Sequence, residues 1–120
     1  MSGNRIVFLL DRMREAAFDA HRFVSDVEKS KFMDDVILQR AVGMSLLMAS
    51  EMAVQLITKH PELVEEHSGF PWASMRGMRN RIAHGYFDID LEKVWATAQI
   101  EAIDIVDKID AIRHWRAQSE

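Results

Sequence analysis

The stretch from residue 79 to residue 86 brings together side chains that could do chemistry. It reads Arg-Asn-Arg-Ile-Ala-His-Gly-Tyr, and with Arg76 it places three arginines within six positions. A guanidinium can hold a phosphate or another oxyanion, and an imidazole can gain or lose a proton near neutral pH. The stretch is therefore either a catalytic cluster or the basic end of a helix followed by a turn.

Four long stretches repeat their apolar residues at three- and four-residue steps, which is typical of amphipathic helices. They predict helices over residues 4–27, 31–58, 72–84 and 91–115. Ser30 and Asp90 are predicted N-caps, Pro61 opens a short helical turn, and Gly85 ends the third main helix. The sequence shows no alternating strand pattern. It predicts an all-α fold, an antiparallel bundle of four main helices plus a short helical turn, in a single domain of residues 1–120.

In two of these helices the apolar residues raise the question of what they pack against. The apolar surface expected for the second helix consists of Val36, Ile37, Met44, Leu47, Met48, Met52, Val54 and Ile57. Its three methionines are interpreted as core-filling side chains. In the fourth helix, Ile100 and Ile103 widen the apolar stripe, which indicates either a broad core contact or a dimer interface.

The composition narrows the class of protein. Hydrophobic residues make up 48% and charged residues 28% of the chain, which is ordinary for a soluble globular protein. No apolar run approaches the roughly 20 residues that cross a bilayer, and the start is not a signal peptide. The absence of cysteine suits a reducing compartment, so we expect a cytoplasmic protein. The net charge of −4 argues against a protein that coats nucleic acid, but it permits a local basic patch.

Arg79 falls on the apolar side of the third main helix when the residues are placed on a helical wheel. Its neighbours there are Met75, Met78 and Ile82. A guanidinium on a core face needs an acceptor, because burying it unpaired is costly. Glu51, within the apolar pattern of the second helix, is the best candidate. The two could form a structural ion pair, and the carboxylate could also aim the arginine at a phosphate.

The other polar side chains of this helix each have a structural explanation. Arg76 and Asn80 lie at the margin of the apolar arc. His84, in the last turn, would interact favourably with the helix dipole, and Tyr86 could simply pack over the helix end. On an ideal helix His84 points away from the core side where Arg79 lies. The two then meet only if the helix unwinds near its end, or if a cleft collects residues from two chains.

The spacing Arg-x4-His-x-Tyr of Arg79, His84 and Tyr86 resembles the motif of the HEPN superfamily. It is most similar to the HepT-like toxins of prokaryotic toxin–antitoxin pairs. The flanking segments 70–72 (Phe-Pro-Trp) and 86–90 (Tyr-Phe-Asp-Ile-Asp) look like that family's pattern, as does the preceding helix with Glu51. The resemblance covers essentially the whole chain in length and helix order.

The resemblance implies a metal-independent endoribonuclease, without a cofactor, whose catalytic residues are Arg79 and His84. In such an enzyme the imidazole takes the proton of a ribose 2′-hydroxyl, which attacks the neighbouring phosphate. The guanidinium stabilises the charge that gathers on the phosphoryl oxygens. Glu51, Arg76 and Asn80 would support this pair. The products would carry a 2′,3′-cyclic phosphate, and DNA would resist because it lacks the 2′-hydroxyl.

The same resemblance implies partners. HepT-like toxins look like homodimers in which both motifs line a shared cleft, and this would bring Arg79 and His84 together. They are paired with a minimal nucleotidyltransferase antitoxin, and the tyrosine of the motif, here Tyr86, would accept the nucleotide (AMPylation) that silences the toxin. The alternative is a helical module without catalytic activity that binds a nucleotidyltransferase partner.

The remaining candidate residues favour no site. One group of metal-ligand types surrounds Pro61 but matches no standard zinc spacing, and it favours a solvated surface: His60, Glu65, Glu66 and His67. His21 and His114 are solitary, and we expect them to be structural or exposed.

Overall fold

The computed structural model describes the backbone of residues 2–119 and the side chains of residues 3–116, and it contains no strand within them. Its elements are α1 (Ser2–Val24), α2 (Lys29–Asp34), α3 (Val36–Lys59), α4 (Pro61–Glu66), α5 (Trp72–Gly85), the 3-10 turn η1 (Tyr86–Asp88), α6 (Leu91–Ala96), the π-helical turn η2 (Thr97–Glu101) and α7 (Ala102–Ser119). The prediction of an all-α fold is confirmed.

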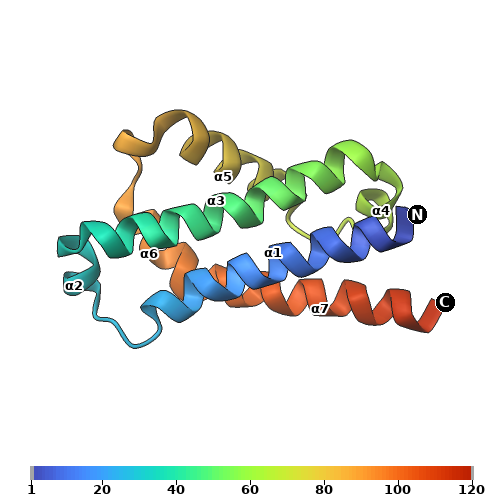
Figure 1. Ribbon diagram of the computed structural model, residues 1–120, viewed down its shortest axis with the longest axis horizontal. Coiled ribbons are helices and arrows are strands. Elements are labelled where there is room, and N and C mark those ends of the chain that lie inside the picture. The colour runs from blue at the N-terminus through green and yellow to red at the C-terminus, as the bar shows by residue number, and fades with distance from the viewer. Residues whose placement is uncertain (1, 120) are drawn as a thin grey trace.

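The long helices alternate in direction along the bundle. In Figure 1, α1 and α3 run side by side along the long axis, α5 lies above α3, and α7 lies below α1. The largest sets of contacts join α1 to α3, α3 to α5, and α1 to α7. Helix α3 is therefore central, with α1 on one side and α5, which carries the motif, on the other.

Two buried clusters hold the bundle together, one toward each end. The first joins the N-terminal part of α1, the C-terminal part of α3, α4, α7 and the start of α5. The second joins the C-terminal part of α1 to α2, the N-terminal half of α3, the end of α5, α6 and η2. Met75 belongs to the first cluster and Ile82 to the second, while Met78 packs against both. Burying one such side chain stabilises a fold by about 1.5–3 kcal/mol, so α5 is fixed at both ends.

The start of the second main helix differs from the prediction. Ser30 does not cap it, because Ser30 lies inside the short helix α2. The chain breaks at Asp35, whose Oδ1 accepts a hydrogen bond from the Leu38 backbone N–H at 3.0 Å, and α3 begins after it. The cap predicted at Asp90 is confirmed, because Asp90 Oδ1 accepts from the Lys93 N–H at 3.3 Å.

The predicted inner face of α3 is wrong. None of the eight residues expected there is buried, and four of them are largely exposed: Val36, Ile37, Met44 and Met48. The buried positions are instead mostly small side chains: Val42, Gly43, Ser45, Leu46, Ala49, Ser50, Ala53 and Leu56. Apolar residues surround nearly the whole helix, so their spacing selects no face. Small residues are buried because α3 lies between two helices and they allow the backbones to approach closely.

The last helix is nearly continuous from α6 to α7, with the π turn η2 inside it. The apolar stripe predicted for it is buried except for Trp95, which is partly buried: Val94, Trp95, Ala98, Ala102, Ile105, Val106, Ile109 and Ile112. Ile100, in the π turn, is 71% exposed, so a core contact is the wrong explanation for that residue, while Ile103 is partly buried.

Helix α3 is also long and apolar enough to cross a membrane by length and composition alone. Within the bundle its small inner face packs between α1 and α5, as in the central helix of a helical core.

Candidate functional site

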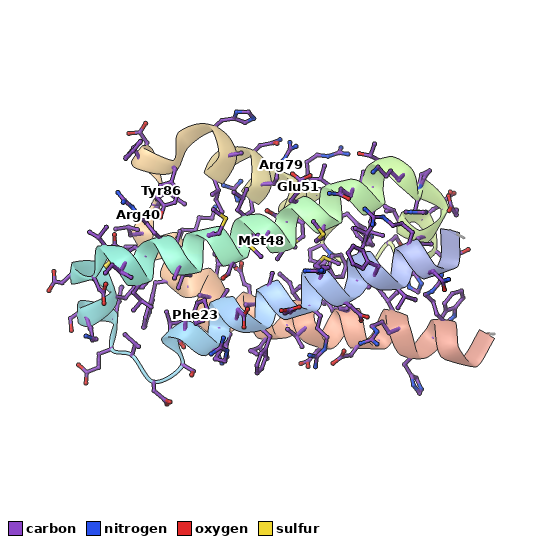
Figure 2. All side chains as sticks on the ribbon, viewed as in Figure 1. Phe23, Arg40, Met48, Glu51, Arg79 and Tyr86 are labelled. Atoms are coloured by element: carbon purple, nitrogen blue, oxygen red, sulfur yellow. The ribbon has the colours of Figure 1, made fainter. Side chains whose placement is uncertain are left out.

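Arg79 is held by the acceptor that the sequence suggested. Its Nε donates a hydrogen bond to Glu51 Oε1 at 2.9 Å, so the two residues form an ion pair between α5 and α3. Its Nη1 donates to Asn80 Oδ1 at 3.0 Å. Each side chain of the ion pair is about one-third exposed, so Arg79 lies at the edge of the core face rather than within it. Figure 2 shows Glu51 and Arg79 next to each other where α5 meets α3.

Two nitrogens of the guanidinium are thus occupied, and the third is free for a ligand. Nη2 makes no hydrogen bond to any residue among those with described side chains, 3–116. A carboxylate that binds one edge of an arginine fixes the direction in which its remaining N–H groups point. Glu51 and Asn80 therefore fix the direction in which the remaining N–H groups of Arg79 point.

His84 lies at the same surface hollow as Arg79. The hollow has a volume of about 360 Å³ and is lined by Leu47, Met48, Glu51, Met52, Arg79, Ala83 and His84. The His84 side chain is exposed, and it has no hydrogen-bond or ion-pair partner among the described side chains. The helix does not unwind before it, because α5 remains helical to Gly85. One chain therefore brings both side chains to a single hollow, which the helical wheel did not lead us to expect.

The predicted C-terminal turn of α5 also differs in detail. Gly85 has a φ of −147° rather than a positive one, so it is not a left-handed cap. The chain instead tightens into the 3-10 turn η1, which begins at Tyr86. Tyr86 is half-buried, and its ring lies against α3 at Gly43, some distance along that helix from Glu51.

The other arginines of the stretch do not reach the hollow. Arg76 is exposed, does not line the hollow and has no ion-pair partner among the described residues, so the structure does not place it with Arg79 or His84. Arg81 lies on a different side of α5, where it lines a separate cavity of about 320 Å³ between α5 and the α6 region. Arg79 and Arg81 therefore lie on two different surfaces of the bundle, although they are close in sequence.

Sequence reasoning missed the residues of α3 that complete the hollow. Met48 and Met52 line it together with Leu47, although the methionines had been interpreted as core residues. Their signal was present in the sequence, since Met48 precedes Glu51 by three positions and shares its helical face. Gly43 was also missed, although a glycine inside a long helix is itself unusual.

The solvated surface predicted around Pro61 is confirmed for Glu65 and Glu66, which are exposed, but it is wrong for His60, which is buried, and His67 is only partly exposed. No three His, Cys, Asp or Glu side chains converge on a possible metal position within the described residues. His67 stacks edge-on against Trp115, with ring centroids 4.9 Å apart, and His60 is buried. His21 Nδ1 lies 3.0 Å from the Ala98 carbonyl oxygen, and His114 is exposed.

Comparison with known proteins agrees with this architecture. The family model described as Ribonuclease HepT-like matches residues 13–112. A candidate RNase of Caldanaerobacter subterraneus subsp. tengcongensis is 30% identical over 105 residues, which cover 88% of this chain and 81% of that protein.

A candidate RNase of Methanocaldococcus jannaschii is also 30% identical over 105 residues, covering 88% of this chain and 84% of the relative. A probable ribonuclease HepT of Thermococcus cleftensis is 25% identical, covering 87% of this chain and 92% of its own. No solved structure gives a significant match. Because the family model spans most of the helical bundle, including α5 and its motif, the chain belongs to the HepT-like ribonuclease family.

Proposed function

We propose that this ribonuclease is the toxin of a cytoplasmic toxin–antitoxin pair and cleaves RNA without a metal ion. His84 takes the proton of a ribose 2′-hydroxyl, and the freed oxygen attacks the adjacent phosphorus. The bond from phosphorus to the 5′-oxygen then breaks, and that oxygen leaves as a hydroxyl with a proton from water, while the His84 imidazolium returns its proton to the solvent. The products are a 2′,3′-cyclic phosphate and a 5′-hydroxyl end.

The position of Arg79 is the observation that carries this proposal. Its guanidinium is held by Glu51 and Asn80, its Nη2 has no hydrogen bond among the described side chains, and Arg79 and His84 line the same hollow. A fixed donor beside the phosphate stabilises the charge that develops on the phosphoryl oxygens, and it does so without reorganising during the reaction. His84, which is exposed and has no partner, is accessible to a substrate hydroxyl.

The proposal includes a homodimer formed through the exposed strip of α3. This strip consists of Ile37, Met44 and Met48, which are 83%, 54% and 49% exposed. It runs along the helix into the hollow, because Met48 belongs to both. Covering the strip with a second copy would remove apolar surface from water and would bring two Arg79–His84 hollows near each other.

Tyr86 is the proposed acceptor for silencing by a nucleotidyltransferase antitoxin. Its hydroxyl oxygen attacks the α-phosphorus of a nucleoside triphosphate, and a new bond forms between this oxygen and phosphorus. The bond to the β-phosphate breaks, pyrophosphate leaves with the electron pair, and the phenolic proton passes to a base of the transferring enzyme. The added phosphodiester places negative charge two residues after His84 in the chain, and we expect this charge to disfavour the approach of an RNA phosphate.

Cleavage of RNA by the unmodified protein in EDTA tests the proposed chemistry. We expect wild type to cleave, and Arg79→Ala and His84→Ala each to lose at least about a hundredfold in kcat/KM, which is the usual cost of losing a catalytic proton-transfer group or charge-stabilising donor. Free imidazole should restore part of the His84→Ala activity, because the histidine side chain is exposed. It should not restore Arg79→Ala.

Two matched variants serve as controls. Arg81→Ala removes an arginine from another side of the same helix, and His114→Ala removes another exposed histidine. Both should cleave like wild type, and an RNA with a 2′-deoxy residue at the cleavage position should be resistant. Equal cleavage by wild type, Arg79→Ala and His84→Ala would refute the catalytic assignment. A wild type shown by intact mass to be unmodified, and still inactive, would favour a module that only binds its partner.

A further inference from the structure

A glycine of α3 lies directly beneath the tyrosine that follows the motif helix. A Cβ atom built on Gly43 would lie 3.1 Å from Tyr86 Cε2, 3.2 Å from the Tyr86 hydroxyl oxygen and 3.5 Å from Cζ. These are its three nearest atoms, so the space beside Gly43 is filled by the hydroxyl end of one ring. Any side chain at position 43 would push that hydroxyl away from α3.

The helix does not need this glycine for its own conformation. Gly43 is a buried position inside the 24-residue helix α3, and no glycine of the described residues has a positive φ. Glycine in a helix interior is less favourable than alanine by about 0.5–1 kcal/mol. The space that it leaves is therefore explained by the ring of Tyr86 and by nothing else near it.

The same face of α3 carries an unpaired cation. Arg40 precedes Gly43 by three positions, and residues three apart lie next to each other on a helix. Its side chain is exposed and has no ion-pair partner among residues 3–116. Figure 2 shows Arg40 and Tyr86 at the same end of α3, apart from Glu51 and Arg79. A guanidinium at this position suits a phosphoryl group attached to the tyrosine hydroxyl.

We propose that Gly43 and Arg40 form a seat on α3 that positions Tyr86 for nucleotidyl transfer. Gly43 admits the ring and fixes the hydroxyl oxygen that attacks the α-phosphorus as pyrophosphate leaves. Arg40 binds the nucleotidyl phosphate during and after transfer. Gly43 acts as a positioning residue and Arg40 as a phosphate-binding residue, and the inference rests on the proposed role of Tyr86 as acceptor. On this proposal, residues of α3 as well as the motif determine that the Tyr86 hydroxyl is the one that reacts.

Nucleotidyl transfer is measured with MgATP and a minimal nucleotidyltransferase of the class proposed as the antitoxin, with intact mass as the readout. Gly43→Leu should slow the transfer at least about tenfold, because a misplaced reacting atom loses the benefit of orientation, and Gly43→Ala should slow it less. Arg40→Gln should raise the KM for MgATP or slow the transfer. The matched controls are Gly77→Ala, whose new Cβ would meet only the flexible end of Arg81, and Arg81→Gln. Both should match wild type.

Reaction with N-acetylimidazole distinguishes misplacement of the hydroxyl from loss of access. Tyr86 is the only tyrosine of the chain, so the O-acetyl ester, which hydroxylamine reverses, reports on one residue. Gly43→Leu should be acetylated as fast as wild type or faster while nucleotidyl transfer slows. A protein labelled with 3-fluorotyrosine should give one ¹⁹F resonance, and this should shift in both Gly43 variants. Melting curves test whether each variant is folded. If Gly43→Leu does not fold, Gly43→Ala is used in its place.

The outcomes separate this inference from the proposed function. Labelling of Tyr86→Phe at the wild-type rate would remove Tyr86 as the acceptor, whatever α3 does. If Tyr86→Phe is not labelled but the folded Gly43 variants are labelled like wild type, the seat is refuted and the acceptor stands. Loss of both acetylation and transfer in Gly43→Leu would also refute it, because the hydroxyl would then be hidden rather than misplaced.

Discussion

At the scale of single residues, the Arg79–Glu51 ion pair orients the guanidinium of Arg79 more than it stabilises the fold. Both side chains are about one-third exposed, and exposed ion pairs contribute only about 0–1 kcal/mol to folding. An arginine at the rim of the core could have been replaced by an apolar residue at little cost in stability. Holding its Nε with a carboxylate while Nη2 remains free is instead an arrangement suited to binding an anion.

Replacement of Glu51 tests that interpretation. In Glu51→Ala the guanidinium loses its acceptor and should swing away, so kcat/KM for RNA should fall by about tenfold or more, as expected when a catalytic group is misplaced. Glu51→Gln keeps an oxygen for the Arg79 Nε and should retain more activity than Glu51→Ala. The melting temperature should change little in either variant, as expected for an exposed ion pair.

Gln55→Ala, one turn further along α3, is the matched control for a lost polar side chain on that helix and should behave like wild type. Unchanged melting together with unchanged cleavage in Glu51→Ala would remove Glu51 from the site. A large loss of stability with normal activity per folded molecule would show that the pair is structural.

At the scale of elements, the amount that could be predicted depended on how each helix distributes its charges. In the first predicted helix, residues 4–27, the charged residues leave one clear apolar stripe. Its members are all buried except Phe23 and Val27, which are partly buried: Ile6, Leu9, Leu10, Met13, Ala16, Ala17, Ala20, Phe23, Val24 and Val27. Helix α3 has few charges and is apolar on most sides, so spacing alone placed the wrong residues inside. The buried face of α3 is determined by tertiary packing, because α1 and α5 both approach it closely. The local sequence pattern of α3 does not contain this information.

The site was predictable to a similar degree. The sequence identified Arg79, His84 and Glu51, and the ion pair between α5 and α3 is present. The sequence did not show that Arg79 and His84 line one hollow. A helical wheel gives only the direction in which each side chain leaves its own helix, and it omits the neighbouring helix that completes the hollow. The space for Tyr86 at Gly43 likewise depends on how two helices meet.

The exposed strip of α3 leads to a prediction about assembly. Met48→Glu places a charge in the proposed interface, so it should shift the protein toward monomer and lower RNA cleavage. Sedimentation or light scattering over a range of concentrations measures the shift. Because apolar side chains exposed in a row mark interaction surfaces, the effect should be larger for Met44→Glu combined with Met48→Glu.

Ile100→Glu is the control, since this residue is 71% exposed but lies on the π turn of the last helix. It should leave the assembly unchanged. The opposite pattern, a monomer from Ile100→Glu and a normal dimer from Met48→Glu, would move the interface to the last helix. A wild type that is monomeric at all concentrations would end the dimer proposal.

At the scale of the whole molecule, charged pairs join the first and last helices along their length. Arg14 Nε donates to Asp110 Oδ1 at 2.7 Å, and Arg113 of α7 pairs with Asp11 of α1 at 3.2 Å. The hydrogen bond from Arg14 holds the pKa of the Asp110 carboxyl below its ordinary value of 3.8. The Arg14 guanidinium correspondingly has a raised pKa, chiefly because of its hydrogen bond to Asp110.

This pair predicts a small acid dependence of stability. Because the folded-state pKa of Asp110 is lowered, its contribution is present above the ordinary carboxyl pKa and is lost as the pH falls through the folded value. Asp110→Asn should lower the unfolding free energy near neutrality by no more than about 1 kcal/mol, since the pair is largely exposed. The difference from wild type should shrink as the pH falls below the ordinary carboxyl pKa.

Urea unfolding at a series of pH values measures that difference. Asp26→Asn, an exposed carboxylate without an ion-pair partner among the described residues, is the control and should not change the acid branch. A difference between Asp110→Asn and wild type that persists unchanged at the lowest pH would show that the charge of Asp110 is not its cause.

The π turn at Thr97–Glu101 has a consequence for how the length of this chain can vary. A π turn holds about one residue more than an α-helical turn, and Ile100 projects from it into solvent. The apolar positions stay buried through the turn, with Val94 before it, Ala98 within it and Ala102 directly after it. A π turn can accommodate a single inserted residue without rotating the packed helix on either side of the insertion. Relatives one residue shorter at this place would then fit the same core with a plain α-helix.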